Sequence, residues 1–369
     1  MVSTPSLVRP RKAFTVSTLP TDVTDLDTIA QALRSSGAAE PDAVLAGAEF
    51  LAIGEGAMAD TFKVHMTWVT DGTGPSSLVM KRPSTDVKAA ATAASLGAYE
   101  REARFYTELA PRSAVRAPGL LGVMTNADSP VPDTVLLEDL TDGYRPGEQL
   151  SETPLIDVRR ARHQLALLQA PFWDDPKTAA LPWLHRRIGV PIPGILERMD
   201  RSWSDAREIR ESLDPPEREC IDRFVAGAGK WAQSASGPCS LVHHDYRVDN
   251  MLFSDSEVVA IDWQTIGWGP VLFDFAYLLG TSLETETRRS VERDELVRYL
   301  ADLEDLGVDW SLDRAWEAYR WSAFAVLLML VPPISSVKST PRSDAMFRRL
   351  LALGARFALD LDSLELLSA

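Results

Sequence analysis

Residues 241–250, Leu-Val-His-His-Asp-Tyr-Arg-Val-Asp-Asn, are the most informative stretch of this sequence. They place Asp245 and Asn250 just beyond an apolar run, in the spacing H-x-D-x-x-x-x-N. Twelve residues after Asn250, a third oxygen-bearing side chain, Asp262, ends another apolar run. Two short β-like runs lie between Asn250 and Asp262, at residues 251–253 and 258–261. A hairpin formed by these runs would bring Asn250 and Asp262 to one end of the pair.

Phosphoryl transfer accounts for these residue types, since the spacing is the catalytic-loop pattern of kinases. The attacking hydroxyl needs a carboxylate to accept its proton and orient it, a role that suits Asp245. The phosphates need Mg²⁺, a hard cation that takes oxygen ligands. We therefore predict Asp245 as the general base, and Asn250 and Asp262 as the magnesium ligands.

Two further residues of the loop receive catalytic assignments. His243 is predicted to brace the loop from within rather than to carry a proton. Arg247, two residues beyond the base, could stabilise charge on the moving phosphoryl group. A surface ion pair is the alternative role for Arg247.

Each of these residues has an alternative explanation. Asp and Asn favour turns and caps, so any one of them alone would indicate only a turn. The joint match of residue types, spacing and strand placement favours a functional site. A metal centre on residues 243–245 is the other alternative, because imidazole and carboxylate ligands suit zinc or iron. The histidines that could complete it, none at a helical i, i+4 spacing, are His65, His163 and His185.

The pattern of apolar residues changes along the chain and predicts two lobes. Strand-like runs are expected at residues 50–53, 62–69, 77–81 and 135–137. Helices are expected at residues 25–33, 89–109, 156–170, 205–213, 217–234, 288–303, 314–330 and 343–361. A β-rich half followed by a helix-rich half indicates an α+β protein with a cleft between lobes. We divide the chain into an N-terminal arm and helix (1–48), a nucleotide-binding lobe (49–140) and a catalytic, substrate-binding lobe (141–369), with a hinge at 138–146.

A glycine turn in the first lobe suits phosphate binding. Gly54 and Gly56 lie between two predicted strands, and without a Cβ they let backbone N–H groups approach phosphates closely. Lys81 ends the next strand, where a lysine can pair with the α- and β-phosphates if a helix carboxylate holds it. Glu102 is the favoured partner for Lys81, and Glu100 is the alternative.

Composition limits the partners of this chain. The 369 residues carry a formal net charge of -15, which argues against a nucleic-acid partner. Such a charge would favour cationic substrates, or it serves only solubility. The longest apolar stretch, 324–334, contains two prolines and is too short to span a membrane. Cys220 and Cys239 are the only cysteines, which fits a reducing, cytoplasmic setting. No protein partner is predicted.

Together these residues resemble the phosphotransferase superfamily that includes aminoglycoside phosphotransferases, choline kinases and ecdysteroid-kinase-like (CHK-type) proteins, the last most closely. The resemblance spans about residues 50–280. It rests on the catalytic-loop motif and on four further segments, which are Glu102-x-x-Phe105-Tyr106, residues 136–140 (Leu-Leu-Glu-Asp-Leu), residues 261–264 (Ile-Asp-Trp-Gln) and residues 269–277 around Asp274. Two positions differ from the family pattern. His244 stands where the family usually has glycine, and Gln169 where it often has histidine.

The resemblance implies a protein-kinase-like fold, with a small β-rich N-lobe and a larger, mainly helical C-lobe. It implies ATP and Mg²⁺ as cofactors, with the backbone near Glu138 and Leu140 facing the adenine. Asp274 would brace the catalytic loop. The expected activity is transfer of a phosphoryl group to a hydroxyl of a small molecule. A protein kinase is less expected, because only twelve residues separate Asp262 from Asp274.

A catalytically inactive nucleotide-binding or scaffolding protein is the rival interpretation. The acceptor is expected among the helices of residues 145–235 and beyond 280. A steroid-like alcohol, an amino alcohol and an aminocyclitol antibiotic all fit. Aromatic side chains that could line its pocket are Phe172, Trp173, Trp183, Trp203, Trp268 and Trp321.

Overall fold

The computed structural model describes residues 25–54, 58–125, 131–185 and 194–367. The described residues form two compact units. The first takes the residues up to Tyr99 together with Gly119–Thr141, and the second takes Glu100–Pro118 and the residues from Asp142 onward. The boundary between Thr141 and Asp142 therefore falls inside residues 138–146, where the hinge was predicted. Residues 100–118 group with the second unit, because Phe105 stacks on Trp263 with ring centroids 3.8 Å apart.

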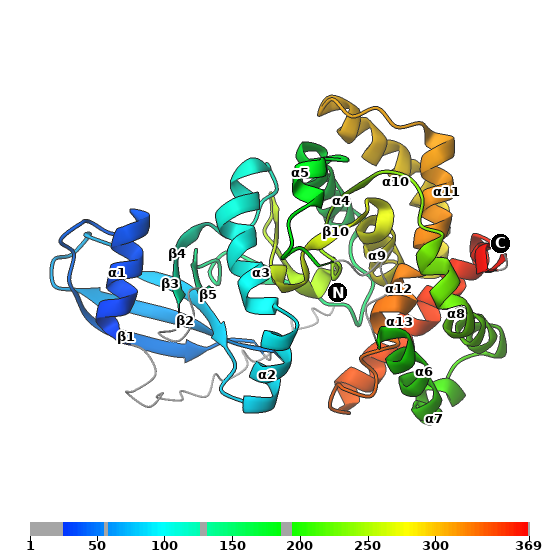
Figure 1. The fold of residues 1–369 in the computed structure, drawn as a ribbon, viewed down its shortest axis with the longest axis horizontal. Helices are drawn as coiled ribbons and strands as arrows, with labels where there is room; N and C mark the ends of the chain where they lie inside the picture. Colours follow the sequence, from blue (N-terminus) through cyan, green and yellow to red (C-terminus); the bar gives the residue numbers. More distant parts are fainter. Residues whose placement is uncertain (1–24, 55–57, 126–130, 186–193, 368–369) are drawn as a thin grey trace, which may run out of the picture. The chain divides into compact units, whose positions relative to one another are not determined.

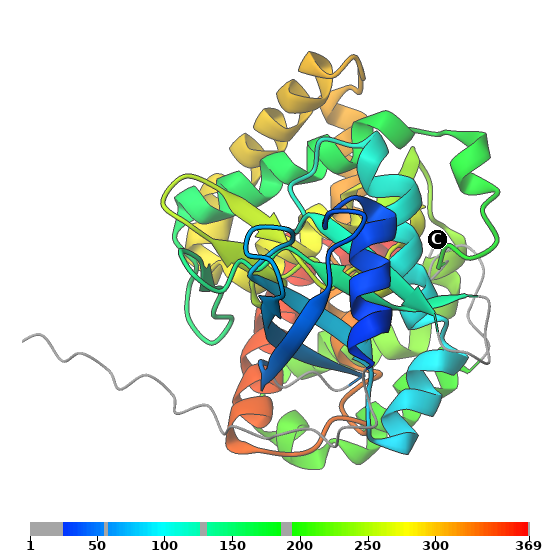
Figure 2. The same cartoon turned by 90° about the vertical axis from the view of Figure 1, so that its left-hand side faces the viewer.

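The first unit is built on an antiparallel sheet in the order β1-β2-β3-β5-β4. Its strands are β1 (Leu45–Ala52), β2 (Ala59–Trp68), β3 (Ser77–Pro83), β4 (Leu120–Thr125) and β5 (Pro132–Leu137). The four predicted strands are confirmed, and β4 is an addition. Helix α1 (Leu26–Ser36) packs against β1 and β4 on one face of the sheet (Figure 1, Figure 2). It therefore belongs to the same unit as these strands.

Helix α1 is fixed by its ends and by its apolar stripe. The side chain of Asp25 caps the first turn, and Gly37 ends the helix in the left-handed region, with φ 79°. Ile29 and Leu33 point into the core against Val64 and other apolar residues of the sheet.

The predicted helix at residues 89–109 is wrong as a single element. The chain forms α2 (Val87–Ser95), breaks at Gly97, and continues as α3 (Ala98–Arg104) with a π-helical turn at Phe105–Leu109. Gly97 has φ 66°, a left-handed conformation that interrupts a helix. Two other predictions also differ. Residues 205–213 belong partly to α6 (Ile195–Asp205) and partly to α7 (Arg207–Glu211), and residues 314–330 divide into α11 (Leu312–Ser322) and α12 (Ala325–Leu330).

The second unit is mainly helical. Its helices are α4 (Leu155–Gln169), α5 (Pro176–Ala179), α6 (Ile195–Asp205), α7 (Arg207–Glu211), α8 (Pro215–Gln233), α9 (Leu272–Ser282), α10 (Thr285–Asp305), α11 (Leu312–Ser322), α12 (Ala325–Leu330) and α13 (Pro341–Asp360). Its strands are β6 (Arg145–Pro146), β7 (Cys239–Val242), β8 (Met251–Phe253), β9 (Val258–Ala260) and β10 (Gly267–Pro270). The sheet-based first unit and helical second unit confirm the α+β class.

Helix α9 lies at the centre of the second unit (Figure 1). Every residue of α9 is buried, and the helix contacts α4, α11, α12 and α13. A helix that is apolar nearly all round must be buried on all sides. Gly280 permits a close approach, because a Cβ there would lie 2.7 Å from the ring of Phe357. This buried helix carries Asp274 and Tyr277 towards the catalytic loop.

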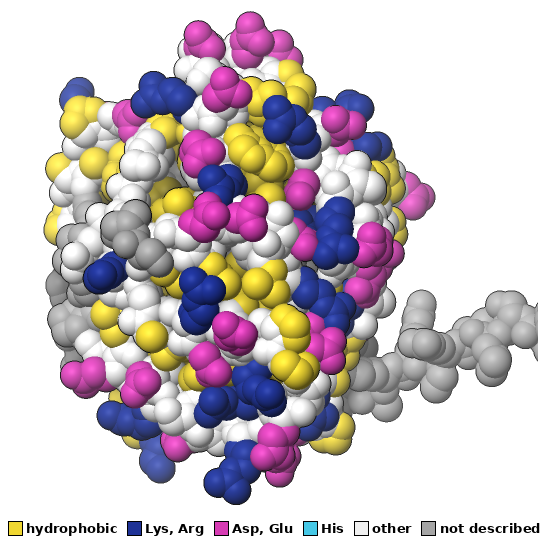
Figure 3. All heavy atoms as spheres, turned by 90° about the vertical axis from the view of Figure 1, so that its right-hand side faces the viewer, with side chains coloured by type: hydrophobic (Ala, Val, Ile, Leu, Met, Phe, Trp, Pro, Cys, Tyr) yellow, Lys and Arg dark blue, Asp and Glu magenta, His cyan; other side chains and the backbone are white. Residues whose placement is uncertain are grey.

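The described surface shown in Figure 3 mixes basic and acidic side chains. Lys and Arg residues alternate there with Asp and Glu residues, with apolar side chains between them. Among the described residues, no helix combines the length and the apolar character that crossing a membrane requires.

Candidate active site

The catalytic loop connects β7 to β8, and the predicted hairpin after it is formed by β8 and β9. Met251 pairs with Ala260, and the amide of Ile261 donates to the carbonyl of Asn250 over 3.0 Å. Asn250 and Ile261 thus lie opposite each other at one end of the hairpin. Asp262 follows Ile261 directly. The two predicted metal ligands, Asn250 and Asp262, therefore lie at the same end of the hairpin.

The carboxylate of Asp245 is held from three sides. Arg247 Nε lies 3.1 Å from Oδ1, and the Tyr277 hydroxyl donates to the same oxygen over 3.2 Å. Asn250 Nδ2 donates to Oδ2 over 2.8 Å and to the Asp245 carbonyl over 2.9 Å. These contacts fix the direction of the predicted base. Tyr277 is the last residue of the segment 269–277, but that pattern predicted no role for it.

The donor set suits Mg²⁺. Both amide hydrogen bonds of Asn250 run from Nδ2 to Asp245, so the planar amide turns Oδ1 to its opposite side. The backbone of Asp262 lies in the left-handed region, with φ 66°. Gln264 Nε2 donates to the carboxylate of Asp262 over 3.5 Å. An amide oxygen and a carboxylate are the hard ligands that this cation prefers.

Asp274 braces the loop, as the resemblance implies. Its buried carboxylate accepts the amides of His243 over 2.6 Å and of His244 over 3.0 Å. Burial raises the pKa of Asp274 to about 7, and the charge of Asp245 adds to the rise while the two amides oppose it. The brace therefore connects α9 to the residues immediately before the predicted base.

His243 uses both ring nitrogens within the site. Its Nε2 lies 3.1 Å from the carbonyl oxygen of Ile261, and its Nδ1 accepts the amide of Asp245 over 3.3 Å. A fully buried ring with both nitrogens engaged suits a brace better than a proton carrier. Within the described ranges, no group of three His, Cys, Asp or Glu side chains is placed to hold a metal.

Arg247 is partly exposed and forms an ion pair with Asp245 within the site. Besides Asp245 it contacts Gln149, whose Oε1 accepts from Nη1 over 2.8 Å. Burial lowers the pKa of Arg247, but the charges of Asp245 and of neighbouring acidic groups together outweigh this effect, so the pKa lies above its ordinary value. The guanidinium is a permanent positive charge beside the predicted base.

The two candidate partners of Lys81 differ in environment. Glu102 is buried, and its Oε1 accepts the amide of Trp263 over 3.3 Å. Glu100 is partly exposed and forms an ion pair with Arg104 at 2.7 Å. Glu100 thus already has a cation of its own.

The predicted nucleotide residues of the first unit have the following positions. Gly54 follows β1 with φ 80°, and Gly56 lies outside the described residues. Lys81 is on β3, between Thr61 and Val135 of the neighbouring strands.

The segment after β5 is tied to residue 119. Glu138 donates its amide to the Gly119 carbonyl over 2.8 Å and accepts the Gly119 amide on its carboxylate over 2.9 Å. Leu140 is buried. The Glu138 amide is thus already engaged, so this amide is not available to an adenine.

Several predicted acceptor-lining aromatics are core residues. Trp321 stacks on Trp231 with centroids 4.3 Å apart, and Trp203 donates to Asp222 over 2.7 Å. Phe172 is fully buried, whereas Trp173, Trp183 and Trp268 are partly exposed. Gln169, at a position where the resemblance expected a histidine, is buried and donates to the carbonyls of Leu241 and Val271.

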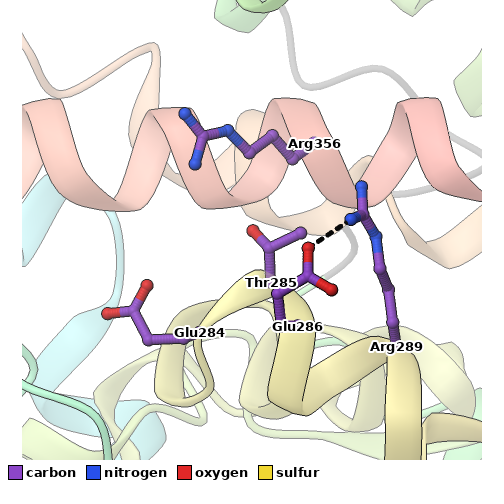
Figure 4. A pocket seen from close by; sticks show the side chains of 5 residues that line it. All are labelled: Glu284, Thr285, Glu286, Arg289 and Arg356. Carbon is purple, nitrogen blue, oxygen red and sulfur yellow. Dashed lines mark hydrogen bonds and ion pairs between the residues drawn. The ribbon is translucent and has the colours of Figure 1, made fainter.

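A surface pocket of roughly 370 Å³ lies elsewhere in the second unit (Figure 4). Its lining residues are Glu284, Thr285, Glu286, Arg289 and Arg356. Arg289 is paired with Glu286 at 2.5 Å and Arg356 with Glu217 at 2.6 Å. The pocket is therefore lined by charges that already have partners, and it includes none of the predicted catalytic residues.

Comparison with known proteins places the chain in a family. Residues 49–321 match the model of the phosphotransferase enzyme family, and the chain belongs to this family. A comparison with curated proteins found no match.

Solved structures share the fold. A choline kinase from Cryptosporidium parvum Iowa II matches at 13% identity and a TM-score of 0.53, over 85% of this chain and 89% of its own. A microcompartment-associated aminopropanol kinase matches at 18% identity and 0.50, over 92% and 99%. A GDP complex of a mutant aminoglycoside 2'-phosphotransferase IIIa matches at 15% and 0.51, over 91% and 98%. The expected kinase-like fold is confirmed.

Proposed function

We propose that this phosphotransferase transfers the γ-phosphate of ATP to a hydroxyl group of a small molecule. The observation that supports the proposal best is the arrangement around Asp245, whose carboxylate is directed by Arg247, Tyr277 and Asn250. Such a fixed carboxylate is what a hydroxyl nucleophile requires. We also propose that the chain is most similar to the ecdysteroid-kinase-like proteins of this superfamily and that it acts in the cytoplasm.

In the proposed reaction, Asp245 accepts the proton of the acceptor hydroxyl as its oxygen attacks the γ-phosphorus. The bond between that phosphorus and the bridging oxygen of ADP breaks, and ADP leaves. Asn250 and Asp262 would hold Mg²⁺, which neutralises charge on the phosphates when bound. Arg247 is close enough to Asp245 to stabilise charge at the same centre.

The nucleotide is proposed to bind residues of the first unit. Gly54 and Gly56 would approach the phosphates, and Lys81 would pair with them while Glu102 holds its ammonium. The segment of Glu138 and Leu140 would face the base. In this unit the left-handed backbone of Gly54 supports the assignment, because it is a conformation that glycine adopts without strain.

The test compares three variants with the wild type. Asp262→Ala should abolish the thermal stabilisation that Mg²⁺-ATP gives, because it removes a metal ligand. Asp245→Asn should still bind Mg²⁺-ATP but lose about 10²- to 10⁴-fold in kcat. Asp305→Asn, an exposed residue at the end of α10, is the matched control and should behave as wild type. Unchanged Mg²⁺-ATP binding in Asp262→Ala would overturn the metal assignment.

A catalytically inactive nucleotide-binding or scaffolding role is the second candidate. It would require nucleotide binding without transfer to any hydroxylated acceptor. A broad acceptor screen that detects ADP release separates the two roles. The joint presence of Lys81, Asp245, Asn250 and Asp262 favours the enzyme.

A further inference from the structure

His244, the residue before the predicted base, has a backbone conformation that side chains rarely adopt. Its φ is 64°, in the left-handed region, and its side chain is fully buried. This conformation is strained for an L-residue. Such a conformation persists only where surrounding contacts determine it. The contacts of the His244 ring must therefore offset the strain of its backbone.

The ring of His244 is bound to the segment that follows Asp262. Its Nδ1 donates to the carbonyl oxygen of Thr265 over 3.1 Å. The hydroxyl of Thr265 in turn donates to the carbonyl of His243 over 2.6 Å. The two segments thus exchange hydrogen bonds in both directions.

Hydrogen bonds from the catalytic loop hold the chain on both sides of Asp262. On its N-terminal side, the ring of His243 contacts the carbonyl of Ile261. On its C-terminal side, His244 contacts the carbonyl of Thr265. Asp262 itself is left-handed, with φ 66°, so its conformation also needs support from its neighbours. Both ends of the short segment are therefore fastened to the loop that carries Asp245.

The packing around the ring restricts it to this position. Its centroid lies 5.3 Å from that of Phe273 and 5.7 Å from that of His185. A Cβ at residue 267 would lie 2.6 Å from the ring Cε1, so the glycine there leaves room for the imidazole. The ring thus fits a space in which Nδ1 faces the Thr265 carbonyl.

We propose that His244 is a positioning residue that fixes Asp262 relative to Asp245. This inference rests on the proposed function, because it concerns the distance between the base and a metal ligand. His244 acts through the Thr265 carbonyl and does not itself contact the reacting groups. Loss of its hydrogen bond should weaken metal use and transfer while leaving acceptor binding unchanged.

The central experiment compares His244→Gly with His244→Asn. Glycine removes the backbone strain but also the donor. Asparagine tolerates the left-handed region, and its Nδ2 occupies the place of Nδ1 along the side chain. We expect His244→Gly to lower kcat about tenfold, the equivalent of one hydrogen bond, and to raise several-fold the Mg²⁺ concentration for half-maximal rate. The acceptor KM should stay unchanged, and His244→Asn should retain kcat within about threefold.

A second pair of variants tests the hydrogen bond from the Thr265 hydroxyl to the carbonyl of His243. Thr265→Val removes the hydroxyl donor with little change in volume, and Thr265→Ser keeps it. Thr265→Val should reproduce the raised Mg²⁺ requirement, and Thr265→Ser should not. Wild-type kcat and Mg²⁺ dependence in His244→Gly would overturn the inference, as would equal impairment of His244→Gly and His244→Asn.

Hydrogen–deuterium exchange separates this inference from the proposed function. The amides of Ile266 and Trp268 donate to backbone carbonyls in the wild type. Their exchange should be faster in His244→Gly than in wild type or in His244→Asn, without any ligand. If the wild type transfers no phosphate, the proposed function fails and exchange alone decides. Equal exchange in all three proteins would then overturn the positioning role.

Discussion

Replacement of Asp274 by asparagine tests the brace beneath the catalytic loop. The carboxylate accepts two backbone amides, from His243 and His244, and asparagine offers only one acceptor oxygen. At least one buried amide would lose its partner, at a cost of about 1–3 kcal/mol. The charged form of this carboxyl is itself unfavourable in the folded protein, because burial raises the pKa of Asp274 to about 7.

The sign of the pH dependence follows from this raised pKa. Between the unfolded pKa of about 4 and the folded value, the native state binds more protons than the unfolded chain. This carboxyl therefore contributes less stability as pH rises through that interval, and the contribution levels off above the folded pKa. Each pH unit well below the folded pKa corresponds to about 1.4 kcal/mol, and the slope falls as pH nears 7, so the change from pH 5 to pH 7 is roughly 2 kcal/mol.

The assay is urea unfolding of wild type and Asp274→Asn at several pH values between 5 and 8. The stability advantage of the wild type should be greatest near pH 5 and fall by roughly 2 kcal/mol towards pH 7. Glu304→Gln, on the exposed surface of α10, controls for the removal of a carboxylate. A constant difference between wild type and Asp274→Asn across the range would refute the reasoning, and so would a difference that grows with pH.

Three other predictions concern the site and its core. Tyr277→Phe removes one donor to Asp245 and should lower kcat about tenfold at unchanged nucleotide affinity; unaltered kcat would mean that the remaining donors suffice. Phe105→Ala should destabilise the second unit by about 3–5 kcal/mol in urea unfolding, because it leaves a cavity beside a stacked indole. Gly280→Ala should cost about 1–3 kcal/mol by overpacking. Gly47→Ala, with no atom within 4 Å of the added Cβ, is its control, and equal losses for the two would contradict the packing argument.

The expectations that the structure confirmed rest on local pattern. The hairpin between Asn250 and Asp262 and the strands of the first sheet follow from short apolar runs bounded by turn residues. Local pattern failed where one residue changed the backbone. Gly97 lies inside a stretch of good helical periodicity, and only its left-handed conformation divides the predicted helix.

The sequence by itself determined the catalytic motif, the α+β class and the family, because these depend on residue types at short, fixed spacings. The tertiary structure alone decided what surrounds the base. Tyr277 is 32 residues from Asp245 in the chain, and Gln149 is 98 residues from Arg247. Such contacts depend on how buried α9 and the segment after the first unit pack against the loop, which no local spacing encodes. His244 differs from the usual glycine in the sequence, but only its contact with Thr265 indicates what the difference does.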